Sequence, residues 1–241
     1  MKQPPMRFWL TFLLSIVPTG VFASQITITS GAGYRQLVID IAANCQKEDD
    51  LTINASYGNF GQMLAHIKMT GMIQAVISDQ SFFSDNHVQA SRYYPIGYGT
   101  LVLAWRKGLL LKSSQDLKRQ DIKRIAIPNL KKALYGKAGK QYLQSSHLFS
   151  TIKPKLYVVA TVPQVTSYLV TGEVDAGFTN LTDIQRVKND IGGYLIIRHG
   201  YHPIKIVTGI LKGHDTSDAI TRYQQCITSK TVKEIAKRHG L

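Results

Sequence analysis

The sequence contains 241 residues, of which 44% are apolar, 18% charged and 9% aromatic. This balance excludes a disordered chain, a collagen and a coiled coil, and the length suffices for two lobes of about 100 residues each. The 29 Lys and Arg residues exceed the 15 Asp and Glu residues by 14 charges. Such an excess fits a nucleic-acid binder, a protein that handles anionic ligands, or a soluble protein that is simply basic.

Residues 1–23 have the composition of a secretory signal peptide. Lys2 and Arg7 precede an apolar run from Phe8 to Phe22, and the small residue Ala23 follows it. The run is shorter than the roughly 18 residues of a membrane-spanning helix, which argues against an anchor. We therefore predict cleavage after Ala23 and a periplasmic protein with 27 basic and 15 acidic residues, an excess of 12. Export removes chromosomal DNA as a partner, so no nucleic acid is expected.

Short β-branched runs then alternate with helical periods, which is typical of an α/β fold with mixed, mostly parallel sheets. The expected strands cover, in chain order, 25–29, 51–55, 74–77, 100–105, 124–127, 156–160, 175–179, 194–198 and 204–211. The expected helices cover 34–46, 60–69, 133–144, 163–170, 216–227 and 231–239. No linker-like segment follows residue 23, so two lobes would be joined by crossing strands.

Two turns rich in small residues follow the first two strands. Residues 29–33 read Thr-Ser-Gly-Ala-Gly, and residues 56–61 read Ser-Tyr-Gly-Asn-Phe-Gly. Each leads into a helix, whose free N–H groups and positive dipole end favour an anion. Ordinary turn and capping chemistry explains the same residues equally well. The first turn lacks the third glycine of a dinucleotide site, so no cofactor is expected.

Two cysteines, Cys45 and Cys226, occur without a Cys-x-x-Cys pair, which excludes a cysteine zinc site. In an oxidising compartment they can form one disulfide between an early and a late helix. Two separately buried thiols are the alternative, and the residues alone do not decide between them.

Catalytic patterns are sparse. His199 and His202 stand three residues apart in a glycine-containing turn with no third ligand, which indicates a surface pair rather than a metal site. Nucleophile-elbow, zinc-helix and phosphate-loop motifs do not occur. We therefore predict no catalytic residue and no bound metal.

Basic residues are dense in the segment 112–140. A solvated face is the favoured interpretation, because charge runs usually face water. The more specific interpretation is that Lys131, Lys132 and Lys137 lie beside a cleft and steer anions toward it.

Taken in order, these turns and strands resemble the periplasmic molybdate-binding proteins of ABC importers, a branch of the two-lobed type II solute-binding proteins. The resemblance covers nearly the whole mature chain and is carried by residues 26–33, 56–61, 76–80, 100–104, 124–127, 154–156, 174–177 and 202–206. It implies one lobe from residues 24–99 and 203–241, a second lobe from residues 100–202, and an anion bound between them. It also implies a monomer that serves a membrane permease.

The family holds its oxyanion through neutral donors. Carried over by position, its two turn serines fall on Gly33 and Phe60, its alanine backbone on Tyr135, its valine backbone on Val162, and its tyrosine hydroxyl on Asn180. Only Val162 matches in type, so four of the five ligand positions differ.

Neighbouring groups can replace some of the lost donors. The candidates are Ser30, Ser56, Asn59 and Asn180, together with the backbone of Gly31 and Gly33. Phe60 and Tyr135, with Tyr57 nearby, would bring aromatic surface into the cleft and suit an organic or planar anion, or simply narrow the pocket.

The sequence therefore predicts an exported receptor for an oxyanion or small organic anion, which it delivers to an ABC permease. The changed ligand positions leave an alternative, a diverged homologue that acts as a sensing or interaction partner of a membrane protein, with another ligand or none. An exported enzyme on the same fold is a weaker third reading.

Overall fold

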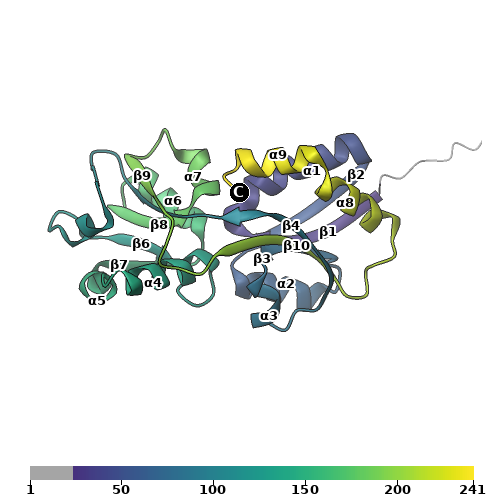
Figure 1. The fold of residues 1–241 in the computed structure, drawn as a ribbon, viewed down its shortest axis with the longest axis horizontal. Helices are drawn as coiled ribbons and strands as arrows, with labels where there is room; N and C mark the ends of the chain where they lie inside the picture. Colours follow the sequence, from purple (N-terminus) through teal and green to yellow (C-terminus); the bar gives the residue numbers. More distant parts are fainter. Residues whose placement is uncertain (1–23) are drawn as a thin grey trace, which may run out of the picture.

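The computed structural model describes residues 24–241, so the predicted signal peptide lies outside the described residues. Two mixed five-stranded sheets, each flanked by helices, form two lobes side by side (Figure 1). The predicted α/β two-lobed fold class is thereby confirmed. None of the helices in the described part of the chain is long and apolar enough to cross a membrane.

Lobe I is built on a sheet of order β2-β1-β3-β10-β4. Its strands are β1 (Ser24–Gly31), β2 (Leu51–Gly58), β3 (Ala75–Asp79), β4 (Ala90–Gly99) and β10 (Ile204–Leu211). Its helices are α1 (Arg35–Asp49), α2 (Phe60–Thr70), α3 (Ser81–Asp85), α8 (Asp218–Thr228) and α9 (Lys230–Arg238), with a short 3-10 turn, η1 (Ala32–Tyr34), before α1. Helices α1, α8 and α9 pack together, whereas α2 and α3 lie on the other side of the sheet (Figure 1).

Lobe II is built on a sheet of order β7-β6-β8-β5-β9. Its strands are β5 (Leu101–Trp105), β6 (Ile125–Pro128), β7 (Leu156–Val159), β8 (Ala176–Asn180) and β9 (Gly193–Ile197). Its helical elements are η2 (Ser114–Lys118), α4 (Leu134–Ser145), α5 (Phe149–Ile152), η3 (Lys153–Lys155), α6 (Val162–Thr171) and α7 (Leu181–Val187). In each sheet the first three strands in spatial order are parallel and the last two pairings are antiparallel.

The chain passes between the lobes twice. Strand β4 runs directly into β5 through Thr100, and residues 198–203 return from β9 to β10. Apolar side chains from both lobes join one buried cluster, which includes Ile28 of β1, Leu101 of β5 and Ile204 of β10. The crossings are therefore packed segments rather than a flexible tether.

A disulfide joins Cys45 of α1 to Cys226 of α8, with the two Cα atoms 5.5 Å apart. Both side chains are fully buried. The structure thus takes the first of the two alternatives that the sequence left open, and the bond ties an early helix of lobe I to a late one.

Four elements have no counterpart among the expected ones, namely β4, α3, α5 and α7. Strand β4 contains Pro95 and two glycines, and its pairing with β10 shifts register twice. Proline is tolerated there because β4 is an edge strand, where a missing N–H costs little. The three helices have only four to seven residues, too few to show a periodic apolar face.

Candidate functional site

A small cavity lies where the two lobes meet, with a volume of about 30 Å³, which is room for a water-sized guest. Its walls come from η1, β3 and the start of α2 in lobe I, and from the starts of α4 and α6 in lobe II. The lining residues are Gly31, Ala32, Gly33, Tyr34, Gly58, Asn59, Phe60, Ser78, Ala133, Leu134, Tyr135, Thr161 and Val162. None of these side chains is charged.

Four helical N-termini border this cavity, two from each lobe. Asn59 caps α2 by accepting a hydrogen bond from the N–H of Gln62, and before α6 the Gln164 side chain accepts a hydrogen bond from the N–H of Thr161 at 3.2 Å. In contrast, Ala133 before α4 and Gly31 before η1 offer no side-chain cap. Helix starts carry unsatisfied N–H donors and a partial positive charge, so their convergence makes a neutral-walled cavity attractive to an anion.

Ser78, near the end of β3, adds a hydroxyl to this wall. The residue is 1% exposed, and its Oγ has no hydrogen-bond partner. A buried hydroxyl without a partner costs free energy unless another group bonds to it. A small polar guest in the cavity would satisfy this oxygen.

Two tyrosines from different lobes meet at the cavity. The hydroxyls of Tyr34 and Tyr135 are 2.6 Å apart and share one hydrogen bond. Burial raises the pKa of both phenols well above the ordinary tyrosine value, so both stay protonated at neutral pH. Because one hydroxyl donates to the other, the second proton is left to donate elsewhere.

Gly99, at the end of the crossing strand β4, lets the tyrosine pair approach the backbone. A Cβ at this position would lie 2.2 Å from the Tyr135 hydroxyl and 2.9 Å from the Tyr34 hydroxyl. Glycine is therefore required where the pair touches the crossing, and the cavity wall is in direct contact with the segment that joins the lobes.

Other direct bonds also hold the lobes together. The N–H of Phe60 donates to the Lys132 carbonyl at 2.8 Å, and Asn180 Nδ2 donates to the Gly33 carbonyl at 3.2 Å. An ion pair between Lys137 of lobe II and Asp85 of lobe I spans 3.0 Å. The lobes are thus closed on each other through protein groups alone.

Six of the ten predicted site residues line the cavity: Gly31, Gly33, Asn59, Phe60, Tyr135 and Val162. Asn180 lies directly behind them, fully buried, and also caps α7 by accepting from the N–H of Asp183. The position of Asn180 explains why residue 33 is a glycine, because a Cβ at position 33 would lie 2.9 Å from Asn180 Nδ2 and 3.1 Å from Val162 Cγ1.

The structure does not bring Ser30, Ser56 and Tyr57 into the lining. Strands β1 and β2 continue to Gly31 and Gly58 instead of ending at residues 29 and 55, so these residues belong to paired strands rather than to turns. Ser56 Oγ donates to the Ile28 carbonyl and the Tyr57 ring lies under the Arg35 guanidinium, so both are engaged outside the cavity.

Sequence reasoning missed three polar residues of the lining, Tyr34, Ser78 and Thr161. Tyr34 is expected only as the first residue of a helix, and Ser78 only within the segment 76–80 that carries the family resemblance, just after the expected strand 74–77. Thr161 falls between an expected strand and an expected helix. The signal for Ser78 was present, since a hydroxyl at the carboxyl end of an otherwise apolar strand faces the crevice where α/β sheets bind ligands. The predicted histidine pair takes no part, because neither His199 nor His202 lines this cavity.

Comparisons with known proteins identify the family of this chain. The family model of the bacterial extracellular solute-binding proteins matches residues 26–241. A curated relative, the molybdate-binding protein ModA of Azotobacter vinelandii, is 24% identical over 98% of both chains.

Solved structures show the same fold. The periplasmic molybdate-binding protein of Azotobacter vinelandii aligns with a TM-score of 0.78 at 21% identity, covering 89% of this chain and 97% of that one. PEB3 of Campylobacter jejuni, solved with L-phospholactate, aligns with a TM-score of 0.70 at 18% identity, covering 89% of this chain and 98% of that one. The chain therefore belongs to the bacterial extracellular solute-binding proteins, which makes it a ligand-binding protein rather than an enzyme.

Proposed function

We propose that this chain is a periplasmic receptor that binds a small anion in the cavity between its lobes and delivers it to the permease of an ABC importer. The observation that carries the proposal is the convergence of four helical N-termini on a cavity without charged side chains. Backbone N–H groups there are fixed in place, so they bind an anion without the desolvation cost of a buried lysine.

The names of the relatives support an anionic ligand. The curated relative binds molybdate and the PEB3 structure holds L-phospholactate, which are both anions. These ligands differ in shape, so the relatives support the charge of the ligand more than its identity.

Size is the property by which this cavity would select. Phe60 and Tyr135 stand where the resembling family has a serine and an alanine, and the remaining volume is about 30 Å³. A compact oxyanion would need only a small separation of the lobes, whereas a bulky organic anion would force them apart. We therefore favour an inorganic oxyanion over an organic one.

Binding would couple to movement of the lobes about the two crossings. Residues 24–99 and 203–241 would move as one body and residues 100–202 as the other. An anion touching α2 on one side and α4 on the other stabilises the closed form by its higher affinity for that form. A membrane permease would then recognise the closed shape.

Thermal unfolding with a panel of molybdate, tungstate, sulfate, phosphate and small carboxylates tests the proposal. A ligand at a hundred times its Kd stabilises the folded state by about 2.7 kcal/mol, so at least one anion should raise the Tm clearly. A Tm that responds to none of them would overturn the proposal.

Substitution of Ser78 locates the site. We expect Ser78→Ala to weaken binding of the active anion by about tenfold to a hundredfold, since it removes a hydrogen bond to a charged group. Thr179→Val is the matched control, because Thr179 is equally buried with an unpartnered hydroxyl and lies outside the lining. Equal losses in isothermal titration would place the anion elsewhere.

A sensing protein is the second candidate, favoured by the direct bonds that close the lobes. Tyr34, Tyr135 and Asn180 bridge the lobes using protein groups alone. Such a protein would stay closed in solution without ligand, which small-angle scattering of the dialysed protein measures. Uptake of the anion by cells that carry the gene together with its permease would decide for transport.

A further inference from the structure

The positive charge of the mature chain is segregated in one lobe. Residues 100–202 contain 16 Lys and Arg against 6 Asp and Glu, an excess of ten. The remaining described residues, 24–99 and 203–241, contain 11 against 9, an excess of two. A charge needed only for solubility would have no reason to gather in one half of the molecule.

Within lobe II much of the charge lies at one end of the sheet. Strands β6 and β7 are parallel, with Ile125 opposite Leu156, so both begin at the same edge. The basic residues just before these strands, and in the loop that follows β5, meet at that edge. We call this group the distal basic end: Arg106, Lys107, Lys112, Lys118, Arg119, Lys123, Arg124, Lys153 and Lys155.

Contacts show that these segments form one surface. Lys155 Nζ donates to the carbonyls of Leu117, Lys118 and Arg119 at 3.1, 3.2 and 2.7 Å, which fastens η2 beside the start of β7. The Arg119 guanidinium in turn donates to the Leu110 carbonyl at 2.9 Å. The loop after β5, η2 and the start of β7 are thus bound to one another.

Acidic residues in this surface neutralise only part of its charge. Asp175 accepts a hydrogen bond from Arg106 Nε at 3.0 Å, and Asp121 pairs with Arg119 at 2.5 Å. Asp116 accepts from the backbone N–H groups of Lys112 and Ser113. Glu173 and Asp190 precede β8 and β9 at the same edge, because Ala176 and Gly193 pair with Trp105 at the end of β5. Nine basic residues against these five acids leave an excess of four.

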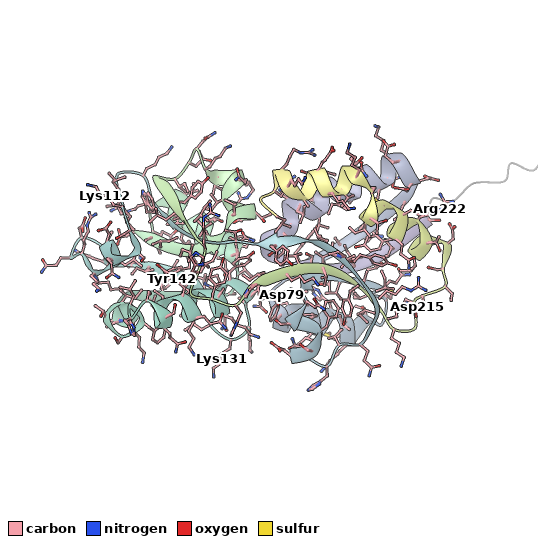
Figure 2. The ribbon with its side chains drawn as sticks, in the orientation of Figure 1. Asp79, Lys112, Lys131, Tyr142, Asp215 and Arg222 are labelled. Atoms are coloured by element: carbon pink, nitrogen blue, oxygen red, sulfur yellow. A yellow bond between two sulfur atoms is a disulfide. The ribbon has the colours of Figure 1, made fainter. Side chains whose placement is uncertain are left out.

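The ligand cavity lies at the opposite end of the same strands. The residues that line it in lobe II follow the carboxyl ends of β6 and β7, whereas the distal basic end precedes their amino ends. Figure 2 shows Lys112 at the outer end of lobe II, away from Asp79 at the junction of the lobes. The strands alone separate the two by about 15 Å, more than the Debye length of about 8 Å at physiological salt. Steering of an anion into the cavity therefore does not account for this charge.

We propose that the distal basic end docks the protein on an anionic phospholipid bilayer. The charges are spread over several backbone segments, as a plane of phosphate headgroups would require. Exposed apolar side chains accompany them: Leu110 is 64% exposed and Tyr157 41%. The Arg124 guanidinium lies 5.0 Å from the centre of the Tyr157 ring. An aromatic ring beside a cation suits the boundary between headgroups and acyl chains.

Sedimentation with lipid vesicles tests this docking. The purified protein should bind vesicles of phosphatidylcholine mixed with phosphatidylglycerol, should release as NaCl increases, and should not bind phosphatidylcholine alone. We expect the triple variant Lys118→Gln, Lys123→Gln and Lys153→Gln to lower the partition coefficient by about a hundredfold. All three lysines are exposed and outside the cavity lining, so binding of an anion in the thermal assay should be unchanged.

The matched control removes three charges from lobe I. Helix α9 exposes Lys230, Lys233 and Lys237. The triple variant Lys230→Gln, Lys233→Gln and Lys237→Gln should keep most of the vesicle binding. Equal loss in both triple variants would show that only total charge matters and would overturn the proposal. Failure of the wild-type protein to prefer anionic vesicles would overturn it as well, whatever the anion panel shows.

A fluorophore gives an independent measurement on the intact surface. Leu110 and Met72 are 64% and 63% exposed, and they lie in lobe II and lobe I respectively. An environment-sensitive dye attached at position 110 should shift to the blue on anionic vesicles, and the same dye at position 72 should not. A shift at position 72 alone would place the membrane contact on lobe I.

Discussion

The two lobes share one scaffold and differ in almost everything outside the cavity. In each sheet one strand has a parallel neighbour on either side, β1 in lobe I and β6 in lobe II. The cavity lies beyond the carboxyl ends of β1 and β2 in lobe I and of β6 and β7 in lobe II. Lobe I is cross-linked by a disulfide and is nearly neutral. Lobe II contains no cysteine and carries most of the excess positive charge. The shared topology therefore fixes where the cavity between the lobes forms and leaves stabilisation and surface chemistry free to diverge.

The largest expected difference between the lobes concerns the disulfide. The double variant Cys45→Ala and Cys226→Ala should lower the free energy of unfolding by about 2–5 kcal/mol, since a cross-link restricts the unfolded chain. Urea unfolding followed by far-UV circular dichroism measures this loss. Trp105 in lobe II provides a second signal. In the double variant we expect the Trp105 fluorescence to change at a higher urea concentration than the dichroism, because lobe I unfolds first. An unchanged urea midpoint would show that lobe I does not depend on the bond.

The tyrosine pair tests how strongly the lobes hold each other. Tyr135→Phe leaves the buried Tyr34 hydroxyl without its partner and should cost about 1–3 kcal/mol of stability. It should also expand the ligand-free protein in small-angle scattering. Tyr142→Phe is the control, because its hydroxyl donates to Ser114 within lobe II, 2.6 Å away. If both variants kept the wild-type radius, the pair would not hold the lobes closed.

The smallest predicted effect lies in lobe II and depends on pH. Burial raises the pKa of Asp175, but hydrogen bonds from the N–H groups of Arg124 and Lys123, together with Arg106, outweigh it and lower the pKa below the ordinary 3.8. The folded state thus favours the ionised form, so this stability is present above pH 3.8 and is lost as the pH falls through the lowered pKa. In Asp175→Asn the Tm should fall less steeply on acidification. Parallel Tm curves for the two proteins would contradict this account.

Sequence patterns predicted the regular strands and the long helices, because period and turn chemistry are local. They missed β4, whose proline and glycines are acceptable only at a sheet edge, and edges are a property of the assembled fold. The same limit applies to the site. Ser56 and Tyr57 were expected in a turn, but β2 continues past them because β1 supplies partners up to Gly58.

Contacts between lobes were beyond any local pattern. Tyr34 and Tyr135 are 101 residues apart, and no spacing rule brings them together. Positions carried over from the resembling family did better, since Gly33, Phe60, Tyr135 and Val162 all line the cavity. A family alignment transfers the place of a residue in space, which composition and periodicity do not.

Gly33 has a consequence for how this cavity could change. Its missing side chain looks at first like a lost hydroxyl donor, yet a Cβ there would press on Asn180 and Val162 of the opposite lobe. Restoring a serine at position 33 would return the donor and at the same time wedge the lobes apart. Positions 33 and 180 are therefore coupled by their contact across the lobes, and a change of ligand specificity at position 33 would require a substitution at position 180 as well.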